Sequence, residues 1–243
     1  IFSIERKAEW RNCRRRVGGR ASPAFVLPQI GGGAVSFAVT AMLEAQGLAK
    51  RYGRRVVLDG ASFAVGAGEM VGVAGGNGAG KSTLLKILAG FLAADGGALR
   101  VHAVIGYAPQ ALLLYGQLTV AEHFEYFSAA RRMERPWAEA GWELARRYRF
   151  EAWWHEPVET LSEGTKQKLN LALALAHDPE LLLLDEHYAG FDWETYLLFW
   201  EHAAELKRAG KSLLIVAHLF YDRTKFDRVL RLAAGRIEQE GRA

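Results

Sequence analysis

A glycine-rich run constrains this chain more than any other feature. Residues 75–83 read Gly-Gly-Asn-Gly-Ala-Gly-Lys-Ser-Thr, which fits the pattern G-x-x-x-x-G-K-[ST]. The apolar residues 69–74 before it predict a short buried strand, and residues 82–88 predict an amphipathic helix after it. A glycine-rich turn at a helix N-terminus lets successive backbone N–H groups converge on a phosphate. The run therefore predicts a phosphate-binding loop in an α/β protein.

The residues of this loop have separate expected roles. Side chains at its glycines would crowd an approaching phosphate. Lys81 is expected to reach the β- and γ-phosphates of a nucleotide, and the Ser82 hydroxyl to bind Mg²⁺. A turn that contains Lys-Ser by chance is the weaker alternative, because the strand and the helix stand in the right places. The predicted nucleotide-binding residues of the loop are Gly75, Asn77, Gly78, Gly80, Lys81, Ser82 and Thr83.

The net charge of +4 is unevenly distributed along the 243 residues. Residues 1–41 contain seven Lys/Arg and two Asp/Glu, so the remainder holds 24 basic against 25 acidic residues. The basic character therefore belongs to the N-terminal stretch and is weak support for nucleic-acid binding. Cys13 is the single cysteine, which excludes an intrachain disulfide.

The first forty-one residues differ in composition from the rest. An Arg-rich start precedes the uncharged residues 21–43, which is the order found in signal peptides. Prolines and a triple glycine interrupt that run before it reaches about 18 consecutive apolar residues. We interpret residues 1–41 as a disordered extension outside the domain, with Met42 as the natural first residue. A membrane-surface tail is the alternative.

Four further stretches follow the loop in the chain. They are residues 107–110 (Tyr-Ala-Pro-Gln), 161–169 (Leu-Ser-Glu-Gly-Thr-Lys-Gln-Lys-Leu), 181–192, with four leucines before Asp185 and Glu186, and 213–218, an apolar strand ending in His218. Together with the loop, their order and spacing resemble the nucleotide-binding domain of ATP-binding cassette (ABC) transporters. The resemblance runs from about Leu48 to Ile237.

The two carboxylates at the end of the leucine strand stand where metal and water chemistry is needed. A strand that ends in Asp185 places a carboxylate where it can hold Mg²⁺ opposite Ser82. By resemblance, Glu186 is the general base that polarises the attacking water. Gln110 resembles the glutamine that touches Mg²⁺ or water and senses the γ-phosphate. His218 resembles the histidine that hydrogen-bonds the γ-phosphate. The alternative is that Asp185 and Glu186 are two exposed acids in a loop. This alternative fits poorly, because the two residues directly follow four leucines.

Three further positions carry nucleotide contacts in the resemblance. Tyr52 matches an aromatic that stacks on adenine; an aromatic in a sheet core is the alternative, but the charged neighbours of Tyr52 favour a solvent-facing ring. Ser162 and Gly164 match the signature motif, where a helix N-terminus binds the γ-phosphate of a nucleotide held by another subunit. Asp192 is also predicted to be a nucleotide-binding residue. Since the chain has one phosphate loop, a homodimer that clasps two ATP molecules is the simplest arrangement.

This chain departs from the family pattern at several positions. Glu163 and Thr165 replace a glycine and a glutamine of the signature, and a carboxylate near a γ-phosphate would repel it. His187 replaces the proline that usually follows the catalytic glutamate. The chain between Leu99 and Gln110 is short, which predicts a reduced antiparallel sheet.

The predicted fold is α/β, with a phosphate-loop NTPase sheet core, a reduced antiparallel β portion and a helical subdomain inserted at about residues 111–160 of a domain over residues 42–243. Residues 120–132 and 137–150 have helical spacing. Four tryptophans fall in this segment, at positions 137, 142, 153 and 154, and we expect some in the core and some at an interface.

The resemblance implies an ATP-binding subunit that hydrolyses ATP with Mg²⁺ and drives a separate membrane-spanning permease subunit. It further implies a location on the cytoplasmic face of the membrane, export as the direction of transport and no nucleic-acid partner. A non-transport ABC protein acting on ribosomes or DNA is one alternative; such proteins usually join two cassettes or carry large insertions, and neither is seen. A regulatory module with weak hydrolysis is the other. The presence of Glu186 argues against a regulatory module, whereas Glu163 in the signature motif leaves this alternative open.

Overall fold

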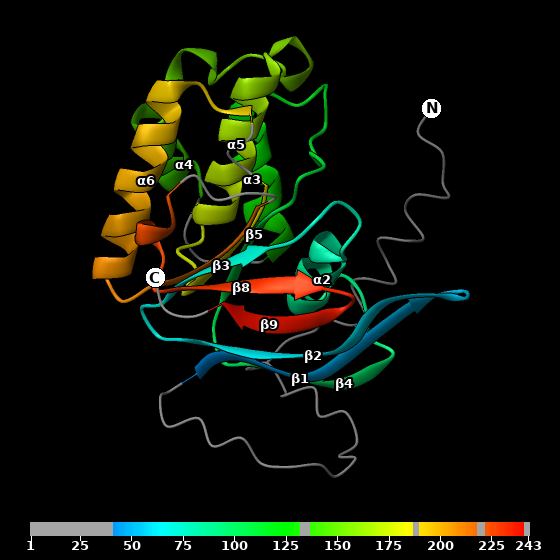
Figure 1. Cartoon of the computed structure of the whole chain (residues 1–243). Coiled ribbons are helices and arrows are strands. Elements are labelled where there is room, and N and C mark those ends of the chain that lie inside the picture. The colour runs from blue at the N-terminus through cyan, green and yellow to red at the C-terminus, as the bar shows by residue number, and fades with distance from the viewer. Residues whose placement is uncertain (1–40, 132–136, 187–189, 218–221, 241–243) are drawn as a thin grey trace.

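Two β-sheets form the framework of the molecule. The computed structural model describes residues 41–131, 137–186, 190–217 and 222–240. The larger sheet has six strands in the order β5-β6-β7-β3-β8-β9, and the smaller sheet has three in the order β2-β1-β4 (Figure 1). The strands of the larger sheet are β3 (Met70–Ala74), β5 (Ile105–Ala108), β6 (Leu181–Asp185), β7 (Ser212–Ala217), β8 (Arg228–Ala233) and β9 (Arg236–Glu240). All pairings in this sheet are parallel except that of β9 with β8.

The central strands are apolar throughout because both of their faces are covered. In β6, Leu181 and Leu183 belong to a core shared with the small sheet, whereas Leu182 and Leu184 belong to a core on the opposite face. Successive side chains of a strand point to opposite faces, so a run of four leucines fits a sheet that is covered on both sides. This arrangement explains why no polar alternation marks β6 or β7 in the sequence.

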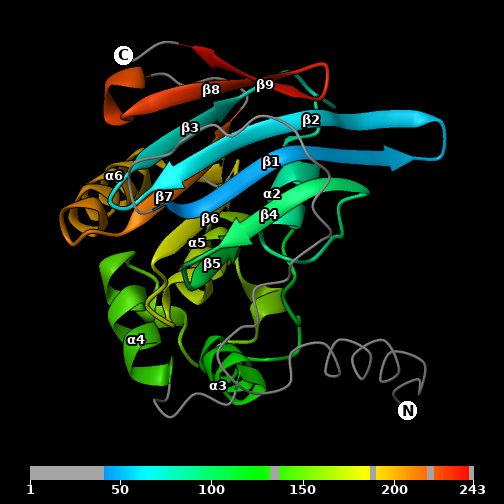
Figure 2. The same ribbon diagram turned by 90° about the horizontal axis from the view of Figure 1, so that it is seen from below.

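The small sheet is the antiparallel portion that the sequence predicts. It contains β1 (Ala41–Tyr52), β2 (Arg55–Gly66) and β4 (Gly96–Val101), all paired antiparallel and lying side by side in Figure 2. The turn between β1 and β2 includes Gly53, whose φ of 58° is accessible to glycine without strain. Residues 43–65 therefore form a strand, a turn and a second strand.

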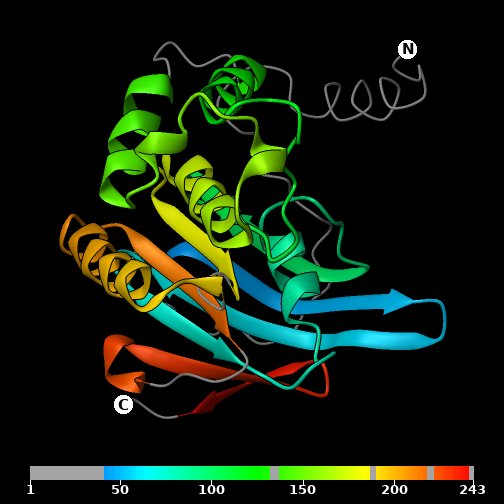
Figure 3. The same ribbon diagram turned by 90° about the horizontal axis from the view of Figure 1, so that it is seen from above.

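Helices cover both faces of the large sheet. Helix α2 (Lys81–Leu88) packs into the core between the two sheets, and α5 (Glu163–Leu175) and α6 (Trp193–Arg208) pack into the core on the other face. Figure 3 shows α5 and α6 above the strands, with α3 and α4 beyond α5. The helical part consists of α3 (Val120–Arg131), α4 (Trp137–Arg147) and the 3₁₀ turns η1 (Glu151–Trp153) and η2 (Val158–Thr160); a further turn, η4 (Arg223–Lys225), precedes β8.

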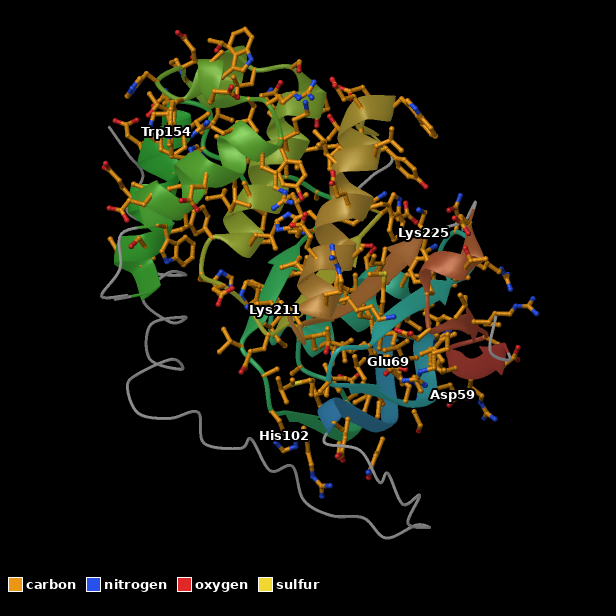
Figure 4. The ribbon with its side chains drawn as sticks, turned by 90° about the vertical axis from the view of Figure 1, so that its left-hand side faces the viewer. Asp59, Glu69, His102, Trp154, Lys211 and Lys225 are labelled. Atoms are coloured by element: carbon orange, nitrogen blue, oxygen red, sulfur yellow. The ribbon has the colours of Figure 1, made fainter. Side chains whose placement is uncertain are left out.

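The tryptophans of the helical part divide between core and surface, and their expected role at an interface stays a prediction. Trp137 and Trp154 are buried, and Trp154 stacks on Phe124 with 5.4 Å between the ring centroids. Trp142 and Trp153 are exposed. In Figure 4, Trp154 lies at the helical end of the molecule, far from the strands.

Helix α4 ends three residues earlier than predicted. The spacing predicts a helix to Phe150, but Arg149 adopts a left-handed φ of 55° that stops the helix. The Phe150 N–H then donates to the Ala145 carbonyl at 2.9 Å, a bond typical of helix C-termini that end in a left-handed residue. Arginine at such a position gives no sequence signal, because glycine usually fills it.

The end of α4 is attached to α6 by three polar contacts. The Tyr148 hydroxyl lies 2.8 Å from Nδ1 of His202, and this pair is flanked by ion pairs of Arg147 with Glu205 and of Arg149 with Glu194. Burial lowers the pKa of His202 to about 4, so its ring is neutral near pH 7. This seam joins the end of α4 to α6, which itself packs into the core on one face of the large sheet.

The described part of the chain begins at Ala41, the first residue of β1. Except for Ala41, the proposed extension over residues 1–41 lies outside the described residues, and it stays a prediction. Across the described ranges, none of the helices combines the length and the apolar character that crossing a membrane requires.

Candidate functional site

The phosphate loop, Gln110 and the two predicted carboxylates lie at the carboxyl ends of adjacent parallel strands. The strand ends are in register: Ala74 of β3 pairs with Ala217 of β7, Asp185 of β6 pairs with Val216 of β7, and Ala108 of β5 pairs with Leu184 of β6. Because parallel strands end at the same edge, the loops that follow them meet there. The fold therefore gathers the phosphate loop, Gln110 and the two carboxylates at one edge.

The phosphate loop requires glycine for steric reasons. A Cβ on Gly75 would lie 2.7 Å from the Leu232 carbonyl oxygen, and one on Gly80 would lie 2.8 Å from the Val57 side chain. Gly80 also has a φ of 102°, which side chains disfavour, and it precedes the first turn of α2. These contacts leave no room for a side chain where the loop packs against β2 and β8.

Lys81 is the most buried cation of the site. It is 6% exposed, and its ammonium donates to the carbonyls of Gly75 at 2.8 Å and Gly76 at 3.2 Å. The same nitrogen lies 3.3 Å from Oε1 of Glu186. The other carboxylate oxygen of Glu186 accepts from Nε2 of Gln110 at 2.9 Å. The structure thus brings Lys81, Glu186 and Gln110 into direct contact.

Glu186 has an unusual backbone conformation. Its φ is 47°, in the left-handed region that non-glycine residues adopt at a cost of about 1–2 kcal/mol. Its N–H donates to the Val216 carbonyl at 2.9 Å, which ties it to the end of β7. Strain of this kind collects at functional sites, where the rest of the structure enforces it.

Asp185 has the environment of a metal ligand. It is 2% exposed, and its Oδ1 is buried without a hydrogen-bond partner among the described residues. Burial raises the pKa of its carboxyl, while a hydrogen bond with the Ser82 side chain acts in the opposite direction. A buried carboxylate oxygen without a partner beside a serine hydroxyl fits a hard cation such as Mg²⁺. Within the described ranges, no group of three or more His, Cys, Asp or Glu could hold a metal, so Mg²⁺ would also need hydroxyl, amide, water or phosphate oxygens.

The start of α5 is a separate, exposed part of the predicted site. The Ser162 hydroxyl caps this helix by accepting from the Thr165 N–H at 3.2 Å, and it lies 2.9 Å from the Thr165 hydroxyl. Glu163 follows it in the first turn and is exposed, and Gly164 is half-buried. The N-terminus of α5 and its serine therefore face outward on one chain.

Asp192 has a structural role of its own. Its Oδ1 accepts from the Thr195 N–H at 2.7 Å and caps α6, and this bond holds the pKa of the carboxyl below its usual range. It also lies 3.8 Å from the Lys168 ammonium. Helix capping thus accounts for Asp192 without a nucleotide, and its predicted nucleotide contact stays a prediction.

Tyr52 faces solvent, as its charged neighbours predict. It is 51% exposed, and the Lys50 ammonium lies 5.9 Å from its ring centroid. Arg55 pairs with Tyr52 across the β1–β2 turn, and its Nη2 donates to the Gly78 carbonyl at 3.2 Å. Tyr52 therefore lies on a hairpin end that contacts the phosphate loop, and its stacking on adenine stays a prediction. Arg55 is a site residue that the sequence analysis did not identify; its only sequence signal is a basic residue just after Tyr52.

Two predicted features lie outside the described residues. His218 directly follows Ala217 at the end of β7, and His187 directly follows Glu186. Their expected effects on the γ-phosphate contact and on the local turn stay predictions.

A hollow of about 500 Å³ lies away from this edge. It is lined by Gly68, Met70, Trp200, Ala204, Lys207, Arg208 and Lys225. It lies at the amino end of β3, whereas the phosphate loop follows the carboxyl end; Lys225 is labelled in Figure 4. Lys207 pairs with Asp227 at 2.6 Å, and Lys225 with Asp222 at 3.8 Å. With two of its three cations already paired, nothing in the hollow selects an anion.

The phosphate loop, the parallel strand order and the carboxylates at one sheet edge define a phosphate-loop nucleotide-binding protein. Residues 58–189 match the family model described as ABC transporter. The chain therefore belongs to the ABC transporter family and has the fold of its ATP-binding cassettes.

Relatives and solved structures agree with this assignment. The Nod factor export ATP-binding protein I of Rhizobium meliloti is 37% identical over 207 residues, which cover 79% of this chain and 62% of that protein. An uncharacterized ABC transporter ATP-binding protein of Methanocaldococcus jannaschii is 30% identical over 208 residues, covering 82% and 77%. A solved ATP-binding subunit of an ABC transporter superimposes with a TM-score of 0.76 at 28% identity, covering 83% and 90%. The chain spans about three fifths of the length of the Rhizobium relative.

Proposed function

We propose that this chain binds ATP with Mg²⁺ and hydrolyses it to drive a separate membrane-spanning subunit, with export as the direction of transport. The observation that carries the proposal is the contact of Glu186 with both Lys81 and Gln110 at the edge where β3, β5 and β6 end. The export direction rests on relatives named as Nod factor exporters. Their transported molecule is not transferred to this chain.

Nucleotide binding is proposed to use the loop backbone and Lys81. The phosphates would accept from the N–H groups at the start of α2, and the helix dipole favours their negative charge. Lys81 would exchange the carbonyls of Gly75 and Gly76 for phosphate oxygens. Bound Mg²⁺ would be held by Ser82, Asp185 and Gln110, and it would supply positive charge against the phosphate oxygens.

Hydrolysis is proposed to use Glu186 as the base. As the water oxygen bonds to the γ-phosphorus, its proton passes to the Glu186 carboxylate, and the bond to the β-phosphate oxygen breaks to give ADP and phosphate. Gln110 orients this carboxylate through Oε2. When Lys81 turns to the phosphates, Oε1 is freed to receive the proton.

The exposed start of α5 supports a dimer. Ser162 and Gly164 would bind the γ-phosphate of a nucleotide held by Lys81 of a second copy, because a helix N-terminus attracts an anion. A C2 dimer then contains two equivalent sites. His218 would contact the γ-phosphate and Tyr52 the adenine. With its permease, the assembly would lie at the cytoplasmic face of the membrane as a peripheral subunit.

Glu163 favours a second candidate function. This exposed carboxylate stands in the first turn of α5, beside the proposed phosphate contact of Ser162. Its negative charge would weaken phosphate binding there. A cassette that binds ATP but turns it over slowly would act as a regulatory module.

An assay of phosphate release distinguishes an ATPase that drives transport from a regulatory module with slow turnover. We expect steady turnover by the wild-type protein and a fall of roughly 100-fold or more in Glu186→Gln, within the range for loss of a general base. Glu201→Gln, an exposed glutamate of α6, is the matched control. Wild-type protein without measurable turnover would favour the regulatory module. Copurification of the native protein with an integral membrane protein tests the permease partner.

A further inference from the structure

We infer that Gln167 is a positioning residue: it clamps the backbone at Gly190 and so couples the start of α5 to the loop that carries Glu186. This inference rests on the proposed role of Glu186 as the base. Gln167 lies on α5, five residues after Ser162, and Gly190 lies between Glu186 and the start of α6. Neither residue belongs to the predicted nucleotide-binding or catalytic set.

The contact between Gln167 and Gly190 is close. A Cβ placed on Gly190 would lie 2.5 Å from Nε2 and 2.6 Å from Cδ of Gln167. Real side chains essentially never come that near, so the Gln167 carboxamide occupies the space that any side chain at position 190 would need. Any side chain at position 190 would therefore have to displace the end of Gln167.

Two further contacts come from the same face of α5. A Cβ on Gly164 would lie 3.4 Å from the Gly190 carbonyl oxygen, and the Lys168 ammonium lies 3.8 Å from Oδ2 of Asp192. Positions 164, 167 and 168 have the i, i+3, i+4 spacing that puts side chains on one helix face. One face of α5 therefore contacts the loop at both Gly190 and Asp192.

The Gln167 side chain is half-buried, and its acceptor oxygen adds no stability. Its Oε1 is buried without a hydrogen-bond partner among the described residues. A buried acceptor left unpaired costs about 1–3 kcal/mol. Removing the carboxamide removes this cost, which offsets the packing that truncation loses, so we expect truncation of Gln167 to leave the stability of the fold unchanged.

The contact of Gln167 with Gly190 is inferred to fix the orientation of Glu186. Glu186 has a left-handed φ at one end of the loop, and Asp192 caps α6 at the other end. Gln167 restrains the backbone at Gly190, between these two points. Without the clamp, the Glu186 carboxylate loses part of its fixed orientation, whereas the phosphate loop and Lys81 are untouched. Misplacement of a reacting group by about 1 Å can cost as much as 100-fold in rate.

The test is a double-mutant cycle with Gln167→Ala and Gly190→Ala. All the nearest atoms that a Cβ at position 190 would meet belong to the flexible end of the Gln167 side chain, so Gly190→Ala acts by displacing that end. We expect each single variant to lower kcat by about 10-fold with an unchanged KM for ATP. The double variant should match Gln167→Ala, because both changes remove the same contact. Gln46→Ala, an exposed glutamine of β1, controls for the truncation itself.

Further measurements keep the inference falsifiable. The thermal unfolding midpoint of Gln167→Ala should not fall below that of wild type; a fall in both midpoint and kcat would indicate a merely structural role. Gln167→Asn, which withdraws the carboxamide by one methylene, should reproduce the kcat loss. Wild-type kcat in Gln167→Ala, or additive losses in the double variant, would overturn the clamp. Glu186→Gln is measured in parallel: if it retains turnover, the proposed function fails instead.

Discussion

The N-termini of α2 and α5 are both proposed to bind phosphate, but they differ in how their backbone donors are occupied. Helix α2 begins after Gly80 and has no side-chain cap, so its first N–H groups have no side-chain acceptor. Helix α5 begins after Ser162, whose hydroxyl already accepts from the Thr165 N–H, and Glu163 adds negative charge to its first turn. The first terminus is open to an anion, whereas the second is partly satisfied by its own residues.

The residues at the two helix N-termini also differ in burial. Lys81 is enclosed by two loop carbonyls and Glu186, whereas Ser162 and Glu163 are exposed. The buried and preorganised site at α2 can bind a nucleotide within one chain. The exposed α5 N-terminus, which is capped by its own serine, would contact a nucleotide that is held by a second copy. The comparison predicts that ATP binding depends on the α2 side alone and that turnover depends on both sides.

Loss of Lys81 should have the largest effect. Lys81→Ala removes the charge-assisted hydrogen bonds to the phosphates, so ATP affinity should fall by roughly 100-fold or more. Equilibrium titration with a fluorescent ATP analogue measures this loss. Lys86→Ala, an exposed lysine of the same helix, should bind normally. Unchanged affinity in Lys81→Ala would remove the assignment of the phosphate loop.

The second change addresses α5. Ser162→Asp keeps a good N-cap, because aspartate caps helices about as well as serine, but it opposes the γ-phosphate of a second copy. Turnover should fall by about 10-fold or more, while ATP affinity and the unfolding midpoint change little. Ser162→Ala, by contrast, should lose about 1 kcal/mol of stability. Full turnover in Ser162→Asp would mean that α5 does not meet a nucleotide.

The seam between α4 and α6 should make stability depend on pH. The pKa of His202 is lowered to about 4 by burial, so its contribution is present above pH 6.5 and is lost as the pH falls toward 4. From pH 7 to pH 5 the unfolding free energy should fall by about 2 kcal/mol through this group. Urea titrations of His202→Asn should lack that part of the fall. Parallel curves for both proteins would show that His202 does not titrate as inferred.

Glu163 should have the smallest effect. Glu163→Gln removes an exposed negative charge from the proposed phosphate contact, so turnover should rise by about 2- to 5-fold at low salt and less at high salt. The same change should lower stability by about 0.3–1 kcal/mol, because an acid in the first turn favours the helix dipole. Turnover that is indifferent to Glu163 would indicate that the side chain points away from the nucleotide.

The sequence predicts the site best where strand order alone decides it. Asp185 and Gln110 follow apolar strands, and parallel pairing brings such strand ends to one edge. Arg55 and Gln167 were not found, since their contacts depend on the β1–β2 register and on the packing of α5 against a distant loop. The early end of α4 was missed because Arg149 takes a backbone conformation that favours glycine. Local patterns identify elements, while contacts between elements require the packed structure.

The central claim is that Glu186 and the dimer act together. Glu186→Gln keeps the size and the hydrogen-bonding capacity of the side chain but cannot accept the proton, so two ATP molecules should remain unhydrolysed between Lys81 of one copy and Ser162 of the other. Size-exclusion chromatography with light scattering should show this variant as a dimer with ATP and Mg²⁺. Wild type should return to monomer as ATP is consumed, and Lys81→Ala combined with Glu186→Gln should stay monomeric. A Glu186→Gln protein that stays monomeric at saturating ATP would contradict the account.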